Sequence, residues 1–197
     1  MQMPILYTDR LRVRPLTMRD LLHVHRLFLD SGWADADQTE ADALEERRDW
    51  LQWSSRNHTQ LAALMQPPFG DRAIELNDGT FAGMVGVVPS YGPFGLIPHF
   101  AAGLPAGADL NLSFPEIGLF WHVHSAHRGQ GYATEAAQAV IDHLFTQINL
   151  RRVVAMTEHD NAASIAVMRR LGMTITQNTS GKPAWLQVVG VLENTIQ

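Results

Sequence analysis

The sequence predicts a single domain of mixed α/β (α+β) architecture, on three observations. The chain has 197 residues, of which 46% are hydrophobic, and this is enough for one core at the usual domain size. Segments with a helical period alternate with short, β-compatible segments. Cysteine is absent, which excludes a disulfide framework, a thiolate metal site and a cysteine nucleophile. We therefore expect residues 1–197 to form one domain, with an insertion at about 89–115.

Capping and turn patterns delimit the elements of the N-terminal half. Thr17 with Asp20, and Asp37 with Glu40, have the form of capping boxes, and Asp78-Gly79 is a typical hairpin turn. In order, the expected elements are a strand at 6–15, a helix from Thr17 to about Leu29, a helical segment, continuous or broken, from Asp37 to Leu64, and a hairpin with strands at 72–77 and 80–88.

The second half begins with a segment, 89–115, that is rich in proline and glycine and too long for an ordinary connection. We expect a flexible lid or pocket wall there, in preference to an ordered surface insertion, because long loops often carry function. The elements expected after it are a strand at 116–124, helices at 133–148 and 161–171, and strands at 152–157, 173–179 and 185–192.

Net charge and hydropathy limit the classes of partner. The net charge is −5 at neutral pH, and a phosphate backbone needs a basic face, so we expect no direct nucleic-acid partner. No apolar run reaches the roughly 18 residues that would span a bilayer, and the N-terminus lacks the apolar region of a signal peptide. We expect a cytoplasmic protein without a membrane partner.

The most informative segment runs from Val123 to Thr134, where a strand leads through a glycine-bearing turn into the clearest helix of the chain. Backbone N–H groups at such a turn point the same way, and the helix dipole favours negative charge there. Gly129 and Gly131 let the backbone approach an anion closely, and Arg128 adds a cation. The pattern predicts a phosphate site, with a plain tight turn as the alternative.

Two ordered motifs carry a resemblance to a known family. Residues 128–133, Arg-Gly-Gln-Gly-Tyr-Ala, resemble the Arg/Gln-x-x-Gly-x-Gly/Ala signature of the GNAT acetyltransferase superfamily. Residues 161–173 are similar to the family's Asn-x-x-Ala/Ser…Gly-Phe helix. Residues 8–17 and 116–118 resemble the branch that contains the ribosomal-protein alanine acetyltransferases. The resemblance covers about residues 5–192, with the insertion as its outlier.

The resemblance implies a mixed, mostly antiparallel sheet that is flanked by helices and splayed between its fourth and fifth strands. Acetyl-CoA would lie in that cleft as co-substrate. Its pyrophosphate would contact the amides of residues 129–134, and its pantetheine arm would contact the Val123 main chain and Asn161. The full set of expected cofactor-binding residues is Val123, His124, Arg128, Gly129, Gln130, Gly131, Tyr132, Ala133, Thr134 and Asn161.

The implied reaction is direct attack of an amine on the thioester, which requires a proton acceptor because amines are mostly protonated at neutral pH. Glu116 is the first candidate base, with a structural salt bridge as its alternative role. His122 is the second candidate, although an aromatic side chain at that strand position could instead simply pack under the pantetheine arm. The oxyanion would accept a backbone N–H at Val123 or His124.

The family's usual proton donor, a tyrosine, falls on position 168, which here is Met168. Ser164 is the substitute that the ribosomal-protein branch implies, although a serine in a first helical turn can simply bond the backbone. The missing tyrosine leaves open a non-catalytic acyl-CoA-binding or sensor module. A different nucleotide-phosphate protein could share the glycine turn, but the helix that begins at Asn161 argues against it.

Two further questions concern metal and acceptor. The sequence His122-Val-His124 places two imidazoles on one strand face, but a third ligand at His127 would occupy the proposed anion turn, so we expect no metal.

The expected acceptor is a primary amine, either a protein N-terminus or a small molecule. We expect the enzyme to be a monomer or a homodimer.

Overall fold

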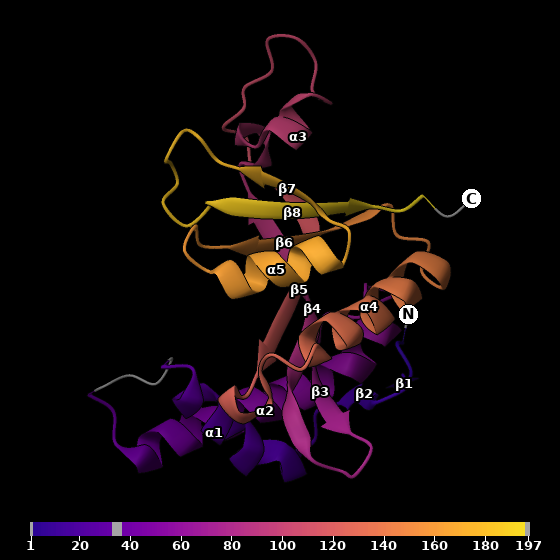
Figure 1. The fold of residues 1–197 in the computed structure, drawn as a ribbon, viewed down its shortest axis with the longest axis vertical. Helices are drawn as coiled ribbons and strands as arrows, with labels where there is room; N and C mark the ends of the chain where they lie inside the picture. Colours follow the sequence, from indigo (N-terminus) through magenta and orange to yellow (C-terminus); the bar gives the residue numbers. More distant parts are fainter. Residues whose placement is uncertain (1, 33–36, 196–197) are drawn as a thin grey trace. The chain divides into compact units, whose positions relative to one another are not determined.

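The structure, a computed structural model, describes residues 2–32 and 37–195 (Figure 1). The strands are β1 (Leu6–Tyr7), β2 (Leu11–Pro15), β3 (Gly70–Leu76), β4 (Phe81–Gly92), β5 (Phe114–Val123), β6 (Arg152–Thr157), β7 (Thr174–Gln177) and β8 (Val188–Glu193). The helices are α1 (Leu21–Asp30), α2 (Glu40–Ala63), α3 (Pro98–Ala101), α4 (Tyr132–Thr146) and α5 (Ala162–Arg170), with short 3-10 turns at Met18–Asp20, Phe94–Leu96 and Ser125–His127.

The strands form a mixed, mostly antiparallel sheet in the order β1-β2-β3-β4-β5-β6-β8-β7, which confirms the predicted fold class. The antiparallel pair β6–β8 is in register over six residue pairs. The parallel pair β5–β6 is in register, among the described residues, at Gly118 and Val154 alone. A pair that holds at one position is what strands that splay apart show, and these are the strands expected to splay.

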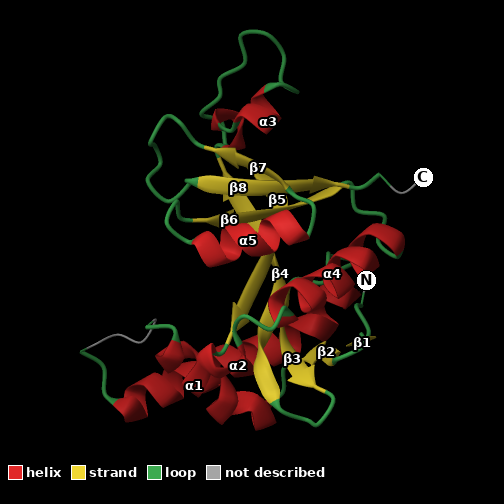
Figure 2. Cartoon of the chain, viewed as in Figure 1, coloured by secondary structure: helices red, strands yellow, loops and turns green. Residues whose placement is uncertain are grey.

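The chain clusters into two compact units, each with its own core. The first comprises residues up to 87 together with 120–143, and the second comprises 88–119 together with the residues from 144 on. In the first unit, α1 and α2 pack on the β2–β4 portion of the sheet (Figure 2). The core between them consists of Leu16, Val24, Leu27, Leu51, Ala73 and Met84. The prediction that residues 1–197 form a single domain stays a prediction.

The core of the second unit includes part of the insertion. Phe94, Ile97 and Phe100, from the 3-10 turn and α3, are buried against the β6 and β8 side chains Val154, Val189 and Val191. The prediction of a flexible lid over 89–115 is therefore wrong for residues 94–101, while a role of the segment as a pocket wall stays a prediction. β4 also extends to Gly92, so the insertion begins later than the sequence suggested. The alternation of β4 continues past Pro89 because that proline lies in an exposed position of the strand.

Two N-terminal elements differ from the sequence prediction. The strand expected at 6–15 is a small hairpin, because the Thr8 N–H donates to the Leu11 carbonyl at 3.0 Å and the Leu11 N–H donates to Thr8 Oγ1 at 3.0 Å. Helix α2 is continuous over 24 residues and is capped by Thr39, which accepts from the Asp42 N–H at 3.2 Å, rather than by Asp37.

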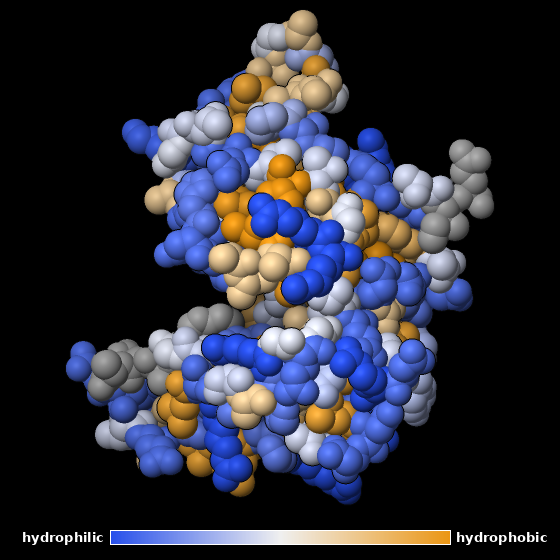
Figure 3. Space-filling view, viewed as in Figure 1, coloured by the Kyte–Doolittle hydropathy of each residue, from blue (hydrophilic) through white to orange (hydrophobic). Residues whose placement is uncertain are grey.

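The face drawn in Figure 3 is largely polar, with hydrophobic residues that reach the surface in places. The most exposed large hydrophobic side chains are Met65, Tyr7, Tyr91, Leu64, Leu112 and Trp53. Apart from the neighbours Leu64 and Met65, these residues lie far apart in the sequence. Over the described ranges 2–32 and 37–195, the structure contains no helix long and apolar enough to cross a membrane.

Candidate functional site

The site begins where β5 ends, beside β4. The His124 N–H donates to the Ala82 carbonyl at 2.9 Å. A Cβ at Gly83 would lie 2.2 Å from the His122 carbonyl oxygen, so only glycine permits this close approach of the two backbones. The His124 amide is thus already hydrogen-bonded to a carbonyl of β4. The role of the Val123 or His124 N–H as oxyanion donor stays a prediction.

The turn after β5 holds two glycines in a left-handed backbone conformation and leads directly into α4. Gly129 and Gly131 have φ values of +76° and +82°, in the left-handed region that favours glycine. The Glu135 N–H donates to the Gly131 carbonyl at 3.0 Å and so begins the ladder of α4. The amides before Glu135 are the N-terminal donors that a helix leaves without an intrahelical partner. Thr134 Oγ1 is buried there with no hydrogen-bond partner among the described residues.

Arg128 forms hydrogen bonds to other parts of the chain. Its Nε donates to the Val123 carbonyl at 2.9 Å, and its Nη2 lies 3.2 Å from Asp30 at the end of α1. Asp30 also accepts the Ser125 N–H at 2.8 Å and the Ser125 hydroxyl. The guanidinium therefore ties the turn to α1 and occupies the Val123 carbonyl. Asp30 was missed at the sequence level, because no local pattern links it to residues almost a hundred positions later.

A second contact reaches the turn from the N-terminus. Arg10, in the turn between β1 and β2, forms an ion pair with Glu135 in the first turn of α4. Its Nη1 donates to the Gln130 carbonyl at 3.0 Å, and its guanidinium lies over the Tyr132 ring at 4.8 Å. Gln130 and Tyr132 were expected at the site, whereas Arg10 and Glu135 were missed at the sequence level as contributors to it.

His122 lies in β5, half-buried in the first unit. Its pKa is lowered from 6.5, first because burial penalises the charged form and then because the Arg128 charge is near, while Asp30 opposes the shift. The imidazole is therefore neutral at neutral pH, the protonation state that a proton acceptor needs.

Glu116, in the second unit, is buried in an ion pair with Arg152. Arg152 Nε donates to one carboxylate oxygen at 2.8 Å, and Nη2 pairs with the other. Arg152 also lies 3.5 Å from Glu193 and 4.6 Å from the Phe100 ring. The hydrogen bond that Arg152 donates to Glu116 is the main cause of a raised Arg152 pKa. This geometry is the salt bridge foreseen as the alternative role of Glu116, and its role as base stays a prediction.

Helix α5 is fixed at its start by Asn161, whose Oδ1 accepts the Ser164 N–H at 3.0 Å. The Asn161 side chain thus acts as a helix cap, and contact with the pantetheine arm stays a prediction for it. Met168 is fully buried, and a Cβ at Gly190 of β8 would lie 3.0 Å from its sulfur. Position 168 therefore belongs to the core, and a methionine suits it.

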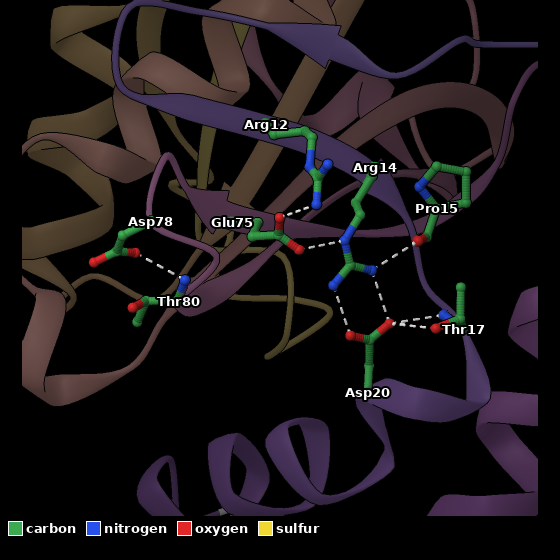
Figure 4. A network of polar contacts seen from close by, with 8 residues as sticks. All are labelled: Arg12, Arg14, Pro15, Thr17, Asp20, Glu75, Asp78 and Thr80. Atoms are coloured by element: carbon green, nitrogen blue, oxygen red, sulfur yellow. Dashed lines mark hydrogen bonds and ion pairs between the residues drawn. The ribbon is translucent and has the colours of Figure 1, made fainter.

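A buried ionic network fixes the corner between β2 and α1 in the first unit (Figure 4). Arg14 donates to Glu75 at 2.6 Å and to both oxygens of Asp20, at 2.7 and 2.8 Å. Burial alone would raise the Asp20 pKa, but the hydrogen bonds from Arg14 and Thr17 outweigh it and lower that pKa. The Thr17 N–H donates to Asp20 at 2.8 Å, as the capping-box pattern predicted.

Imidazoles and carboxylates are not grouped for metal binding in the described part of the chain, where no three of them come together. His124 and His127 have ring centroids 6.2 Å apart. The His124 Nδ1 accepts the Ala126 N–H at 3.3 Å, which uses this ring to cap the short turn after β5.

Comparison with known proteins adds independent support for the family. Residues 10–174 match the model of the acetyltransferase (GNAT) domain. The chain is 28% identical to the uncharacterized protein YkkB of Bacillus subtilis (strain 168) over 176 residues, which cover 85% of this chain and 84% of that protein.

Two solved structures show the same fold. An acetyltransferase from Agrobacterium tumefaciens str. C58 aligns with a TM-score of 0.66 and 22% identity, over 98% of this chain and 96% of that one. RimL, a ribosomal L7/L12 alpha-N-protein acetyltransferase in complex with coenzyme A, aligns with a TM-score of 0.62 and 18% identity, over 95% of each chain. With the domain match spanning most of its length, the chain belongs to the GNAT acetyltransferase family.

Proposed function

We propose that this acetyl-CoA-dependent N-acetyltransferase holds the pyrophosphate of its co-substrate on the amides of residues 129–134 and acetylates the N-terminal amine of a protein. The observation that carries the proposal is the turn of Gly129 and Gly131, whose positive φ values open α4 with its first amides unpaired within the helix. An anionic pyrophosphate would complete those hydrogen bonds and complement the helix dipole.

The proposed reaction forms one bond and breaks one. The acceptor amine, deprotonated, attacks the thioester carbonyl carbon, and the new C–N bond gives a tetrahedral oxyanion. The Val123 N–H is the proposed donor to that oxyanion. Collapse breaks the C–S bond, and the thiolate leaves with its electron pair. Because thiols titrate near 8.5, protonation of this leaving group assists the step without being essential.

His122 is the proposed acceptor of the amine proton. Its lowered pKa keeps the imidazole neutral, whereas both oxygens of Glu116 are hydrogen-bonded to Arg152. Glu116 would have to weaken its ion pair with Arg152 in order to accept a proton from the amine. Ser164 is the proposed donor to the thiolate, since its backbone N–H, but not its hydroxyl, is used by Asn161.

The acceptor class rests on the likeness to RimL, which is described as an alpha-N-protein acetyltransferase. A panel of short peptides with free or blocked N-termini, assayed beside small primary amines, tests this choice through release of the CoA thiol. Turnover of free-amine peptides but not blocked ones supports it. Turnover of small amines alone would reassign the acceptor, and CoA binding without any turnover would favour a sensor.

The turn itself is tested by Gly131→Val. Valine is strongly disfavoured at φ +82°, so the amides after Gln130 should lose their alignment, and CoA affinity should fall at least tenfold by calorimetry. Gly79→Val is the matched control, because Gly79 has a φ of +89° and similarly open surroundings but lies in the β3–β4 turn. Equal CoA affinity in the two folded variants would contradict the proposed site.

A further inference from the structure

The turn that precedes α4 is held in place by a residue near the N-terminus, far from it in the sequence. We infer that Arg10, fixed by Glu135, is a positioning residue for acetyl-CoA, which aims the Gly131 N–H at the pyrophosphate. The inference rests on the proposed pyrophosphate site. It concerns how the site is kept in its binding conformation, and it assigns no contact between Arg10 and the ligand.

The turn needs such a fixture, because two glycines flank Gln130. Glycine adopts positive and negative φ with similar ease, so the peptide groups between Gly129 and Gly131 could rotate into several arrangements. Nothing within 4 Å of Gly129 would obstruct even an added Cβ. A turn with this freedom would lose conformational entropy on binding, and that loss would reduce affinity.

Arg10 removes this freedom at one defined peptide group. Its Nη1 donates to the Gln130 carbonyl at 3.0 Å. In a trans peptide the C=O and the following N–H point in opposite directions. A Gln130 carbonyl that points at Arg10 therefore turns the Gly131 N–H away from Arg10. A flip of this peptide would aim a carbonyl, instead of an N–H, toward the place of the anion.

Arg10 is itself held by a network around Glu135. The Glu135 carboxylate accepts from Arg10 Nε at 2.6 Å, from the Arg10 N–H at 3.1 Å and from the Thr8 hydroxyl at 2.6 Å. Burial alone would raise the Glu135 pKa, but the hydrogen bonds from Thr8 and Arg10 outweigh it and lower that pKa. The carboxylate is thus ionised at neutral pH, and its charge offsets that of Arg10.

Because Glu135 neutralises the Arg10 charge, an experiment can distinguish two roles of Arg10: positioning of the turn and direct attraction of the pyrophosphate. If the Arg10 charge attracted the pyrophosphate, removal of the Glu135 charge would strengthen CoA binding. If Arg10 positions the turn, the same change would loosen the guanidinium and weaken binding. The two roles thus predict opposite signs for Glu135→Gln, a variant that keeps the size and one acceptor oxygen of the side chain.

The experiment measures affinity for CoA and for pantetheine, which lacks the pyrophosphate, by calorimetry. Arg10→Gln and Glu135→Gln should each weaken CoA binding by about three- to tenfold, as expected when one or two charge-assisted contacts are lost. The CoA affinity of the double variant should not be lower than that of the single variant that binds CoA less tightly, because the two residues act as one unit. Pantetheine binding should not change. Arg56→Gln, on the exposed face of α2, is the control for the loss of one positive charge.

Arg10→Lys and Thr8→Val complete the series. Lysine keeps the charge but lacks the planar fork that reaches Glu135 and Gln130 together, so it should behave like glutamine. Thr8→Val leaves the guanidinium intact and should cause a smaller loss in a stably folded protein. Tighter CoA binding by Glu135→Gln, or full affinity in Arg10→Gln, would overturn the inference. If wild-type CoA affinity did not exceed that for pantetheine, the pyrophosphate site itself would fail.

Discussion

The ion pair between Glu116 and Arg152 makes it possible to test whether Glu116 has a structural role or acts as the general base. We expect Glu116→Gln to lower the melting temperature by several degrees, because partly buried Arg152 loses the charge that compensates its own. Turnover at a permissive temperature should stay within about tenfold of the wild type, less than the loss of a general base would cause. A rate loss of more than a hundredfold with unchanged melting would instead identify Glu116 as the base.

His122→Gln is the matched variant for catalysis. As proton acceptor, His122 should account for about 10²–10³ in rate. Because the His122 pKa is lowered, the acid limb of the wild-type pH–rate profile should lie below the ordinary histidine value of 6.5, and it should vanish in the variant. An unchanged profile would leave proton removal to water.

At the residue level, the sequence could predict which backbone segment forms the anion turn but not what holds it. Gly129, Gly131 and the start of α4 follow from local preferences of the chain. Arg10 and Glu135 are 125 residues apart, so their contact depends on how the first hairpin folds against α4. Local patterns in a single sequence cannot predict a contact between residues so far apart in the chain.

Two glycines test how the strands tolerate side chains. A Cβ at Gly83 would meet the His122 carbonyl oxygen at 2.2 Å and Val123 Cα at 2.8 Å, so Gly83→Ala should cost about 3 kcal/mol or more. A Cβ at Gly190 would meet only the flexible thioethers of Met168 and Met173, at 3.0 Å, so Gly190→Ala should cost about 1 kcal/mol. Urea unfolding gives both values, and equal losses would contradict the rigid approach at Gly83.

Element boundaries were predictable where a side chain defines them and not where packing does. Thr17 and Asp20 bond as their spacing suggested. The hairpin within 6–15 was missed because Thr8, rather than a glycine, closes its turn. The insertion was misjudged because proline and glycine suggested a loop, while Phe94, Ile97 and Phe100 supplied enough apolar surface to join the core.

For the molecule as a whole, Asp71 and His58 should give stability opposite dependences on pH. Burial raises the pKa of Asp71 to about 6, so its protonated form stabilises the fold below about pH 4, and that contribution is lost as pH rises through 6. Burial, with the Arg72 charge, lowers the pKa of His58 to about 4, so stability falls as pH drops from 6.5 to 4.

Asp71→Asn separates the two effects. The variant should melt at a higher temperature than the wild type above pH 6, and the difference should disappear near pH 4. Asp78→Asn is the control of opposite sign, because the Thr80 N–H donates to Asp78 at 2.9 Å and lowers its pKa. A uniform melting difference for Asp71→Asn across this range would show that its ionisation does not affect stability.

The buried stem of the insertion also limits how this enzyme can be re-engineered. The segment 94–101 contributes to the same apolar cluster as β6 and β8, so its removal would uncover the core rather than trim a loop. From 105 to 113 the chain is mostly exposed and returns over Gly95 through the Leu110 backbone. Insertions, deletions, fusion partners and new recognition loops should therefore be tolerated best between residue 101 and Leu110, because the insertion is held in place at both of these points.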